Sequence, residues 1–321
     1  MIGVLFSLLL QGAPIPKSMT ECVETHRLDP SKKLTRGRWA PATFDALNSL
    51  IERRGAKGDG FDRCKRPLAV FDFDNTIIVN DLGERALDFG LEVGLIKPTP
   101  ASADALPEDL KSQLDPKKVS TSSAARTLVH QVYSALEDRD EQAAYAWLAQ
   151  LYAGNERETL TQFAAKLLGV ALTEPLEKVT VGDVTVSRGI RIRAEMVDLI
   201  ATLDAHGFDV FIVTASAEWL VREVAPRLGL SRDRVIGIRV AEKGPLTARV
   251  LPPVTYRGGK VQAIRTRIPP GGRVPVFAIG DSRTDLEMLT DATDLAVLID
   301  RGSEELRTVA LGKGFVVQPA F

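Results

Sequence analysis

The chain has few residues of the kinds that bind zinc, and it carries almost no net charge. Its 321 residues include three histidines and two cysteines, and none of these forms a spacing such as H-x-x-x-H or C-x-x-C, so we expect no zinc site. The formal net charge of -1 argues against nucleic acid or an anionic membrane as a partner. With 45% hydrophobic and 26% charged residues, the composition is typical of a globular protein of one or two domains.

The N-terminal apolar run Ile2–Leu10 is too short to cross a bilayer, and we expect no stable membrane insertion. The run has the length of a signal-peptide core, but no lysine or arginine precedes it and no A-x-A cleavage site follows. We predict that residues 1–16 are a signal peptide and that the protein is exported to the periplasm or the medium. The alternative is an N-terminal strand, frayed or packed on the core, of a cytoplasmic protein. Cys22 and Cys64 fit both cases, as one disulfide after export or as free thiols otherwise.

The pattern of elements predicts a core that is interrupted by a helical insertion. Residues 17–66 are expected to form an N-terminal arm and a helix over 39–54. We assign the catalytic core to residues 67–80 and 187–321, and a helical cap to residues 81–186. Within the cap we expect a mostly irregular segment at 97–123, helices at 125–136, 144–151 and 160–167, and a hairpin at 179–186.

From residue 190 onward, strands and helices alternate. We expect strands at 210–213, 235–240, 274–279 and 295–299, helices at 192–203 and 217–228, and a small hairpin at 247–256. A first apolar strand at 68–73 precedes the cap. This alternation predicts an α/β fold, with a doubly wound, mainly parallel, Rossmann-like sheet and a mostly helical cap inserted after the first core strand.

Candidate catalytic residues stand at the carboxyl ends of the expected strands, where open α/β sheets bind their ligands. Asp72 and Asp74 end the first strand in the sequence F-D-F-D-N-T. One carboxylate can attack phosphorus, and the other can move the proton of the leaving group. A D-x-D pair also occurs in turns and in metal-dependent glycosyltransferases, so the pair alone does not decide the function.

Two further motifs offer groups that can hold a phosphoryl group. Thr214, Ala215 and Ser216 provide hydroxyl and backbone N–H groups at the end of a strand, with helix capping as the alternative. Lys260 follows two glycines at the start of a helix, where it can neutralise charge on phosphorus and pair with the nucleophile. A solvated lysine is the alternative there.

A fourth motif, G-D-S-R-T-D, brings Asp281 and Asp285 to the same edge of the sheet. Magnesium prefers oxygen ligands, commonly one or two carboxylates together with water and substrate oxygens. We expect Asp281 to bind Mg²⁺ directly and Asp285 to orient either a ligand water or Lys260.

The order, strand contexts and spacing of these four motifs resemble those of the haloacid-dehalogenase superfamily. The resemblance implies that Asp72 is the nucleophile and Asp74 the general acid/base, with Thr214 and Lys260 holding the phosphoryl group. It also implies Mg²⁺ bound by Asp72, the backbone carbonyl of Asp74, and Asp281.

The acid at Asp74 is typical of the phosphatases and phosphomutases of this superfamily, so the resemblance implies hydrolysis of a phosphate monoester. Asn75 departs from the Gly or Ser of many relatives. The helical insertion resembles that of the phosphoserine-phosphatase-like branch, in which the acid at the position of Asp81 meets the substrate amine. The segment from Asp72 to Glu84 also resembles the bacterial phosphorylcholine phosphatases, which are exported.

The expected substrate is a small phosphorylated metabolite, such as an amino-alcohol or choline-type phosphate. Asp81 and Glu84 would then face its ammonium group, and Trp219 or Phe71 would add a cation–π contact. The alternatives are that Asp81 and Glu84 only cap a helix and that Trp219 packs beneath its own helix. A phosphoserine phosphatase, a broad-specificity acid phosphatase, a phosphomutase and a catalytically decayed, exported binding protein stay open, and the sequence indicates no oligomeric state.

Overall fold

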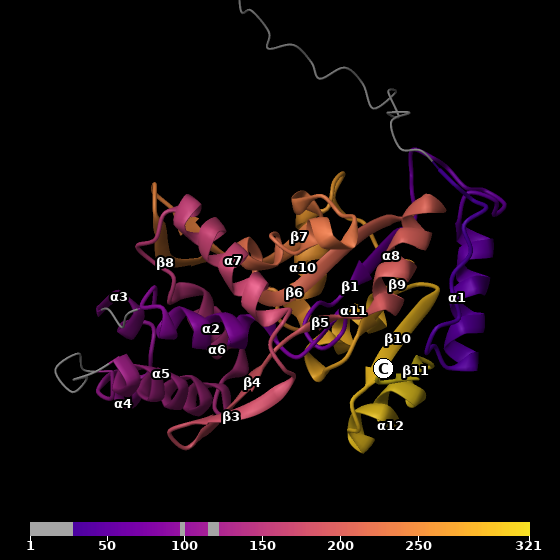
Figure 1. Cartoon of the computed structure of the whole chain (residues 1–321). Helices are drawn as coiled ribbons and strands as arrows, with labels where there is room; N and C mark the ends of the chain where they lie inside the picture. The colour runs from indigo at the N-terminus through magenta and orange to yellow at the C-terminus, as the bar shows by residue number, and fades with distance from the viewer. Residues whose placement is uncertain (1–27, 97–99, 115–121) are drawn as a thin grey trace, which may run out of the picture.

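The computed structural model describes residues 28–96, 100–114 and 122–321 (Figure 1). The predicted signal peptide, residues 1–16, and Cys22 lie outside the described residues, so export and the pairing of the cysteines stay predictions. Within the described ranges, no helix is both long enough and apolar enough to cross a membrane.

A seven-stranded sheet forms the centre of the molecule, in the order β11-β10-β9-β1-β6-β7-β8. Its strands are β1 (Leu68–Phe71), β6 (Asp209–Ala217), β7 (Val235–Glu242), β8 (Leu246–Leu251), β9 (Phe277–Gly280), β10 (Leu295–Asp300) and β11 (Val316–Pro319). All neighbours pair in parallel except β8, which is antiparallel to β7. All four residues of the central strand β1 are buried, as expected for a strand that is covered on both faces.

Helices cover both faces of the sheet, which confirms the predicted α/β fold with a mainly parallel sheet. One face packs against α1 (Pro41–Arg54) and α8 (Ala194–Ala205), and the other against α10 (Gly258–Arg267), α11 (Leu286–Asp291) and α12 (Glu304–Gly312). Successive side chains of a strand point to opposite faces. In β1, Phe71 therefore belongs to the first core and Val70 to the second.

A mostly helical insert, residues 82–188, follows β1 and lies to the left of the sheet in Figure 1. It consists of α2 (Leu82–Glu92), α3 (Pro100–Ala103), α4 (Glu108–Lys111), α5 (Ser122–Glu137), α6 (Glu141–Gln150), α7 (Arg157–Ala171) and the hairpin β3 (Glu177–Val181) to β4 (Val184–Arg188). The hairpin matches the prediction, and Gly182 in its turn has a φ of +66°. A short antiparallel pair, β2 (Ile78–Val79) and β5 (Arg191–Ile192), closes the base of the insert.

The helix predicted over 217–228 is wrong in length. Strand β6 continues to Ala217, and the α-helical part, α9, covers only Glu218–Val221. Pro226 then lies in a separate 3-10 turn. A proline has no N–H group to donate and clashes with the preceding helical turn, so a regular helix does not pass through this position.

Three other predicted elements differ from the structure. The segment 97–123 contains the one-turn helices α3 and α4 and the start of α5. Residues 247–256 form no hairpin of their own, because β8 pairs with β7 and the following Pro252 and Pro253 have no N–H groups to extend the ladder. The strand expected at 274–279 begins only at Phe277, where β9 starts. The short strands β2, β5 and β11 were not predicted.

Candidate active site

The candidate active site lies where the neighbouring strands β1, β6 and β9 end. Asp72 follows β1 directly, and its backbone nitrogen lies 2.9 Å from a carbonyl oxygen of β9 to which it donates. Asp281 follows β9, while β6 lies on the other side of β1. The pairing of β6 with β7 shifts register between Val213 and Ala217, so residues 214–216 leave the regular ladder. The sheet therefore brings three of the predicted motifs to one edge.

A tight turn after β1 sets the direction of the second carboxylate. The N–H of Ile77 donates to the carbonyl of Phe73 at 2.8 Å, and Asn75 adopts a left-handed φ of +57°. Asparagine tolerates this conformation better than most residues, which accounts for Asn75 in place of glycine. The turn places Oδ1 of Asp74 2.8 Å from the first backbone N–H of α2.

Asp74 also accepts hydrogen bonds from the β6 segment. The hydroxyl of Ser216 donates to Oδ2 of Asp74 at 2.7 Å, and that of Thr214 does so at 3.4 Å. Burial, and next the charge of Asp81, raise the pKa of Asp74 to about 8 against the opposing effect of these hydrogen bonds. At neutral pH Asp74 therefore holds a proton, which is the state that a general acid requires.

Lys260 is fully buried at the start of α10 and contacts two carboxylates. Its Nζ lies 2.7 Å from Oδ1 of Asp72 and 2.6 Å from Oδ1 of Asp285. Burial lowers the pKa of this ammonium group, but the charges of Asp285 and Asp72 outweigh that effect and raise the pKa above its usual value. Lys260 is therefore a permanent cation beneath the site.

Of the two carboxylates that contact Lys260, Asp72 is the one that reaches the cavity. Its pKa is raised to about 7, first by burial and then by the charge of Asp285, while Lys260 acts in the opposite direction. Only 6% of its surface is exposed. The small exposed part lines the cavity described below, so a substrate in the cavity can reach Asp72 but not Asp285.

Asp285 fixes the loop that carries Asp281. Its Oδ2 accepts the backbone N–H groups of Asp281 and Ser282, each at 3.1 Å, so both of its oxygens are occupied within the chain. Asp281 accepts from Thr76 at 3.2 Å and pairs with Arg301 at 2.9 Å. Burial, and next the charge of Asp72, raise the pKa of Asp281 well above its usual value. The acidic groups of the site thus outnumber the two cations, Lys260 and Arg301, that contact them.

A cavity lies above these carboxylates and is bounded by both the core and the insert. Its core residues include Asp72, Asp74, Ala215, Ser216, Asp281 and Arg301. Its insert side is formed by Asp81, Tyr133, Tyr145 and Leu148. The predicted residues Thr214, Lys260 and Asp285 are fully buried and do not line the cavity, and each contacts another residue of the site instead.

Asp81 and Glu84 differ in position. Asp81 lines the cavity and also caps α2, because its Oδ1 accepts the N–H of Glu84 at 2.8 Å. Asp81 therefore caps a helix, as the alternative predicted, and also reaches the cavity. Glu84 lies one turn further on and does not line the cavity. Burial and the neighbouring acids raise the pKa of Asp81 to about 8 and that of Glu84 to about 7.

The aromatic residues of the cavity are not the predicted ones. Phe71 is fully buried in β1 and makes an edge-to-face contact with Phe277. Trp219 packs on Tyr152, with their ring centroids 4.9 Å apart, and lines a different groove. The predicted cation–π contacts of these two residues are therefore wrong, because both side chains are used for packing outside the cavity.

Tyr133 and Tyr145, from α5 and α6, line the cavity instead. The Tyr133 hydroxyl is buried and has no hydrogen-bond partner among the described residues, while the Tyr145 hydroxyl donates to Glu141 at 3.1 Å. No sequence pattern distinguished these tyrosines, since they stand at ordinary helical core positions. Arg301 was also not predicted, although it directly follows strand β10 just as Asp72 follows β1 and Asp281 follows β9.

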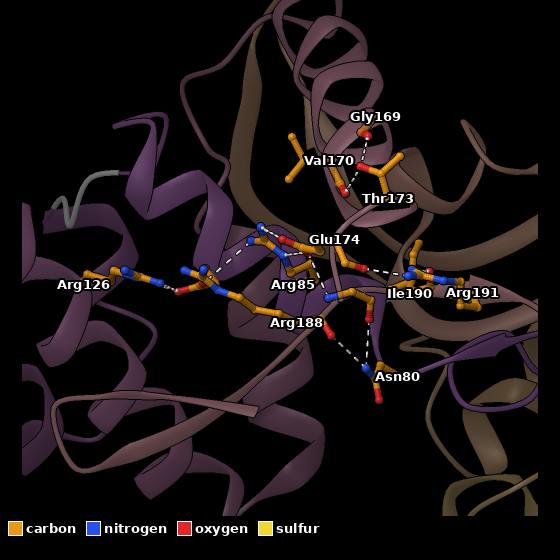
Figure 2. A network of polar contacts seen from close by, with 12 residues as sticks. Asn80, Arg85, Arg126, Gly169, Val170, Thr173, Glu174, Arg188, Ile190 and Arg191 are labelled. Atoms are coloured by element: carbon orange, nitrogen blue, oxygen red, sulfur yellow. Dashed lines mark hydrogen bonds and ion pairs between the residues drawn. The ribbon is translucent and has the colours of Figure 1, made fainter. Parts of the chain in front are cut away.

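A network of polar contacts fixes α2 within the insert (Figure 2). Fully buried Asp88 accepts from Arg126 at 2.7 Å and contacts His130 at 3.1 Å and Arg85 at 3.5 Å. Arg85 also makes a two-pronged pair with Glu174, at 2.6 and 3.1 Å. The charged groups satisfy one another, as burial requires.

The same network joins the two chain segments that connect the core to the insert, one at Asn80 and the other at Gly189. In Figure 2 the Asn80 side chain points at the returning chain, where its amide donates to the carbonyls of Arg188 at 3.2 Å and Gly189 at 2.9 Å. Glu174 accepts the N–H of Gly189 at 2.9 Å. Because Asp81 follows Asn80 directly, these contacts also position Asp81 at the cavity.

Comparison with known proteins agrees with this geometry. The family model of haloacid dehalogenase-like hydrolases matches residues 69–290, which contain all four motifs. A phosphorylcholine phosphatase of Pseudomonas aeruginosa is 28% identical over 279 residues, which cover 76% of this chain and 74% of that protein. A phosphoserine phosphatase of Halobacterium salinarum is 34% identical over 115 residues, covering 35% of this chain and 54% of that protein.

Two solved structures share the fold at low sequence identity. A protein of unknown function from Anaerococcus prevotii is 20% identical, with a TM-score of 0.68, and the match covers 88% of this chain and 93% of the other. A protein of unknown function from Bordetella pertussis is 19% identical, with a TM-score of 0.58, and the match covers 80% and 99% of the two chains.

Proposed function

The chain belongs to the haloacid dehalogenase-like hydrolases and has phosphatase relatives, and we propose that it is a phosphomonoesterase that forms an aspartyl-phosphate on Asp72. The observation that carries the proposal is the different surroundings of two nearby acids. Lys260 lies 2.7 Å from Asp72 and favours its charged form, whereas burial and the charge of Asp81 raise the pKa of Asp74 to about 8. One acid is thus suited to attack and the other to give a proton.

In the proposed reaction, a carboxylate oxygen of Asp72 attacks phosphorus, and the bond from phosphorus to the ester oxygen breaks. Asp74 donates its proton to the departing alkoxide. Water then attacks phosphorus, Asp74 takes the proton of that water, and the bond to Asp72 breaks to release inorganic phosphate. Lys260 holds Asp72 in position and balances the charge on the phosphoryl oxygens.

The same acids suit a divalent cation of the Mg²⁺ type. Asp72, Asp281 and Asp285 are buried and each places one oxygen within 4.8 Å of the others. With Asp74 they make four carboxylates against one buried lysine and the half-exposed Arg301. We assign Mg²⁺ binding to Asp72, Asp281 and the Asp74 carbonyl, while Asp285 holds the lysine and the loop. When bound, Mg²⁺ neutralises charge on the phosphoryl group.

The insert side of the cavity supports a substrate with a cationic head group, such as a phosphorylated amino alcohol or phosphocholine. Asp81 lines the cavity beside Tyr133 and Tyr145, and the charges of Glu84 and Glu137 act on these groups from close by. Mutual repulsion of these acids contributes to their raised pKa values, and a bound cation relieves it. Each tyrosine ring can add a cation–π contact of about 0.5–2 kcal/mol.

A comparison of kcat/KM across phosphocholine, phosphoethanolamine, phosphoserine and p-nitrophenyl phosphate, with Mg²⁺ present, tests the proposal. We expect the cationic esters to be preferred, and Asp81→Asn to reduce kcat/KM for phosphocholine more than for p-nitrophenyl phosphate. Asp109→Asn, which changes an exposed aspartate of α4, is the matched control. Equal values for all substrates would overturn the substrate class but not the reaction, and no phosphate release at all would overturn both.

The alternatives predict different outcomes of the same experiment. A phosphoserine phosphatase would prefer phosphoserine to phosphocholine, and a broad-specificity acid phosphatase would show no preference. A catalytically decayed binding protein would release no phosphate, and it has less support because Asp72, Lys260 and Asp281 are all present and in contact with partners. Export, which rests on the apolar run at residues 2–10, is also a proposal.

A further inference from the structure

A second groove lies between α7 of the insert and α9, β7 and β8 of the core. Four arginines line it, Arg157, Arg222, Arg239 and Arg267, together with two glutamates, Trp219 and apolar residues of β7 and β8. We call it the arginine groove. None of the residues that line it also lines the active-site cavity. A ligand here is therefore separate from the substrate of the proposed phosphatase.

The two glutamates of the groove are already paired. Glu218, which is 4% exposed, contacts Arg222 at 2.8 Å, pairs with Arg267, and accepts the N–H of Gly237 at 2.9 Å. Glu242 pairs with Arg157. Four arginines against two glutamates leave two positive charges in the groove. The chain supplies no further acid among the residues that line it.

Three hydrogen-bond donors of residues that line the groove are buried and have no partner among the described residues. They are Nε1 of Trp219 and the Nε atoms of Arg222 and Arg239. Trp219 is only 6% exposed. The guanidinium of Arg239 has one contact, to the carbonyl of Pro252 at 3.5 Å, which is longer than an ordinary hydrogen bond. Arg157, Arg222 and Arg267 each pair with a glutamate, whereas Arg239 has no carboxylate partner among the described residues, so its guanidinium can take an acceptor from a ligand.

We propose that the arginine groove binds a small oxyanion of the phosphate type. Such an anion has several acceptor oxygens, which suit the guanidinium groups that line the groove, and its charge balances the excess of the arginines. The planar, forked guanidinium groups suit a tetrahedral oxyanion better than a halide, which offers no separate oxygens. Because Arg157 comes from the insert and Arg239 from the core, the bound anion bridges the two parts of the molecule.

Calorimetric titration of the full chain with inorganic phosphate tests this site, with a chelator present at pH 7.5. The chelator removes any divalent cation that would hold phosphate in the active site, and the loss of binding in a groove variant assigns the remaining binding to the arginine groove. We expect saturable binding of one phosphate, and Arg239→Met should raise its dissociation constant about tenfold or more, the loss expected for a charged hydrogen bond. Arg249→Met, which changes an exposed arginine of β8 outside the groove, should leave the constant unchanged.

The variant Arg239→Lys is a second test, since it keeps the positive charge but removes the forked donors of the guanidinium group. It should weaken phosphate binding by a smaller factor than Arg239→Met, and it provides the comparison if the Met variant does not fold. No binding to the unmodified chain up to about 10 mM phosphate overturns the proposal. Equal affinity in the Arg239→Met variant, or equal loss in Arg249→Met, overturns it as well.

Discussion

The ammonium group of Lys260 lies 2.7 Å from Oδ1 of Asp72, and both side chains are buried. Asp285 contacts the same ammonium at 2.6 Å, so one lysine balances two acids that come from separate parts of the chain. The proposed nucleophile is therefore held in one orientation, and its charged form is favoured by a neighbour that does not itself line the cavity. In the proposed mechanism, both catalysis and the stability of the fold depend on the contact between Lys260 and Asp72.

Replacing this lysine should destabilise the fold. Lys260→Met leaves two buried acids without their cation, and breaking such a pair usually costs about 3–5 kcal/mol. Urea unfolding at pH 7.5, followed by tryptophan fluorescence, measures the loss. Lys166→Met, on the exposed side of α7, is the control and should change the free energy of unfolding little. An unchanged free energy of unfolding in Lys260→Met would contradict the pairing.

Asp74→Asn should slow the reaction without removing the metal. The asparagine can still accept the N–H of Leu82, so the turn is kept, but it cannot exchange a proton. We expect kcat to fall by about 10²–10⁴. The Mg²⁺ concentration for half-maximal activity should stay nearly constant, because the proposed ligand is the backbone carbonyl. A large rise in that concentration would show that the Asp74 side chain binds the metal.

Stability should depend on pH through Asp81. Its pKa rises from 3.8 to about 8 on folding, so between these values the folded chain holds a proton that the unfolded chain has released. Its contribution to stability therefore declines as the pH rises from about 4 to 8. Asp81→Asn should stabilise the ligand-free protein by at least about 1 kcal/mol at pH 8, and not at pH 4. The same effect in urea unfolding at both pH values would argue against this shift.

Asn80 should be important for joining the insert to the core. It has a φ of +67° and donates to the carbonyls of Arg188 and Gly189. Asn80→Ala loses these bonds and strains the backbone, and should cost about 1–3 kcal/mol. Asn80→Gly keeps the backbone conformation accessible, so it should cost less in the same unfolding measurement. Equal costs for the two variants would show that the backbone conformation contributes nothing.

The sequence was most informative at the strand ends. Asp72, Thr214 and Asp281 could be placed together because parallel strands that run into polar residues meet at one edge of the sheet. The periodicity of the insert also predicted its long helices. These features depend on local patterns and on the general geometry of parallel sheets.

The cavity above that edge could not be predicted in the same way. Tyr133 and Tyr145 reach it only because α5 and α6 pack in a particular orientation, which depends on contacts between distant residues. Their spacing on each helix is that of core residues. Trp219 was considered as a cation–π partner with packing as the alternative, and packing is what the structure shows, because β6 continues to Ala217 and Trp219 lines another groove.

Trapping the covalent intermediate tests the central claim most directly. The enzyme is mixed with phosphocholine and Mg²⁺, quenched in acid, treated with borohydride to convert an acyl phosphate to a reduced residue, and mapped by mass spectrometry. We expect substrate-dependent reduction of Asp72, and neither reduction nor phosphate release in Asp72→Asn. Phosphate release by Asp72→Asn at the rate of the unmodified enzyme, with no modification of Asp72 in either protein, would contradict the proposed mechanism.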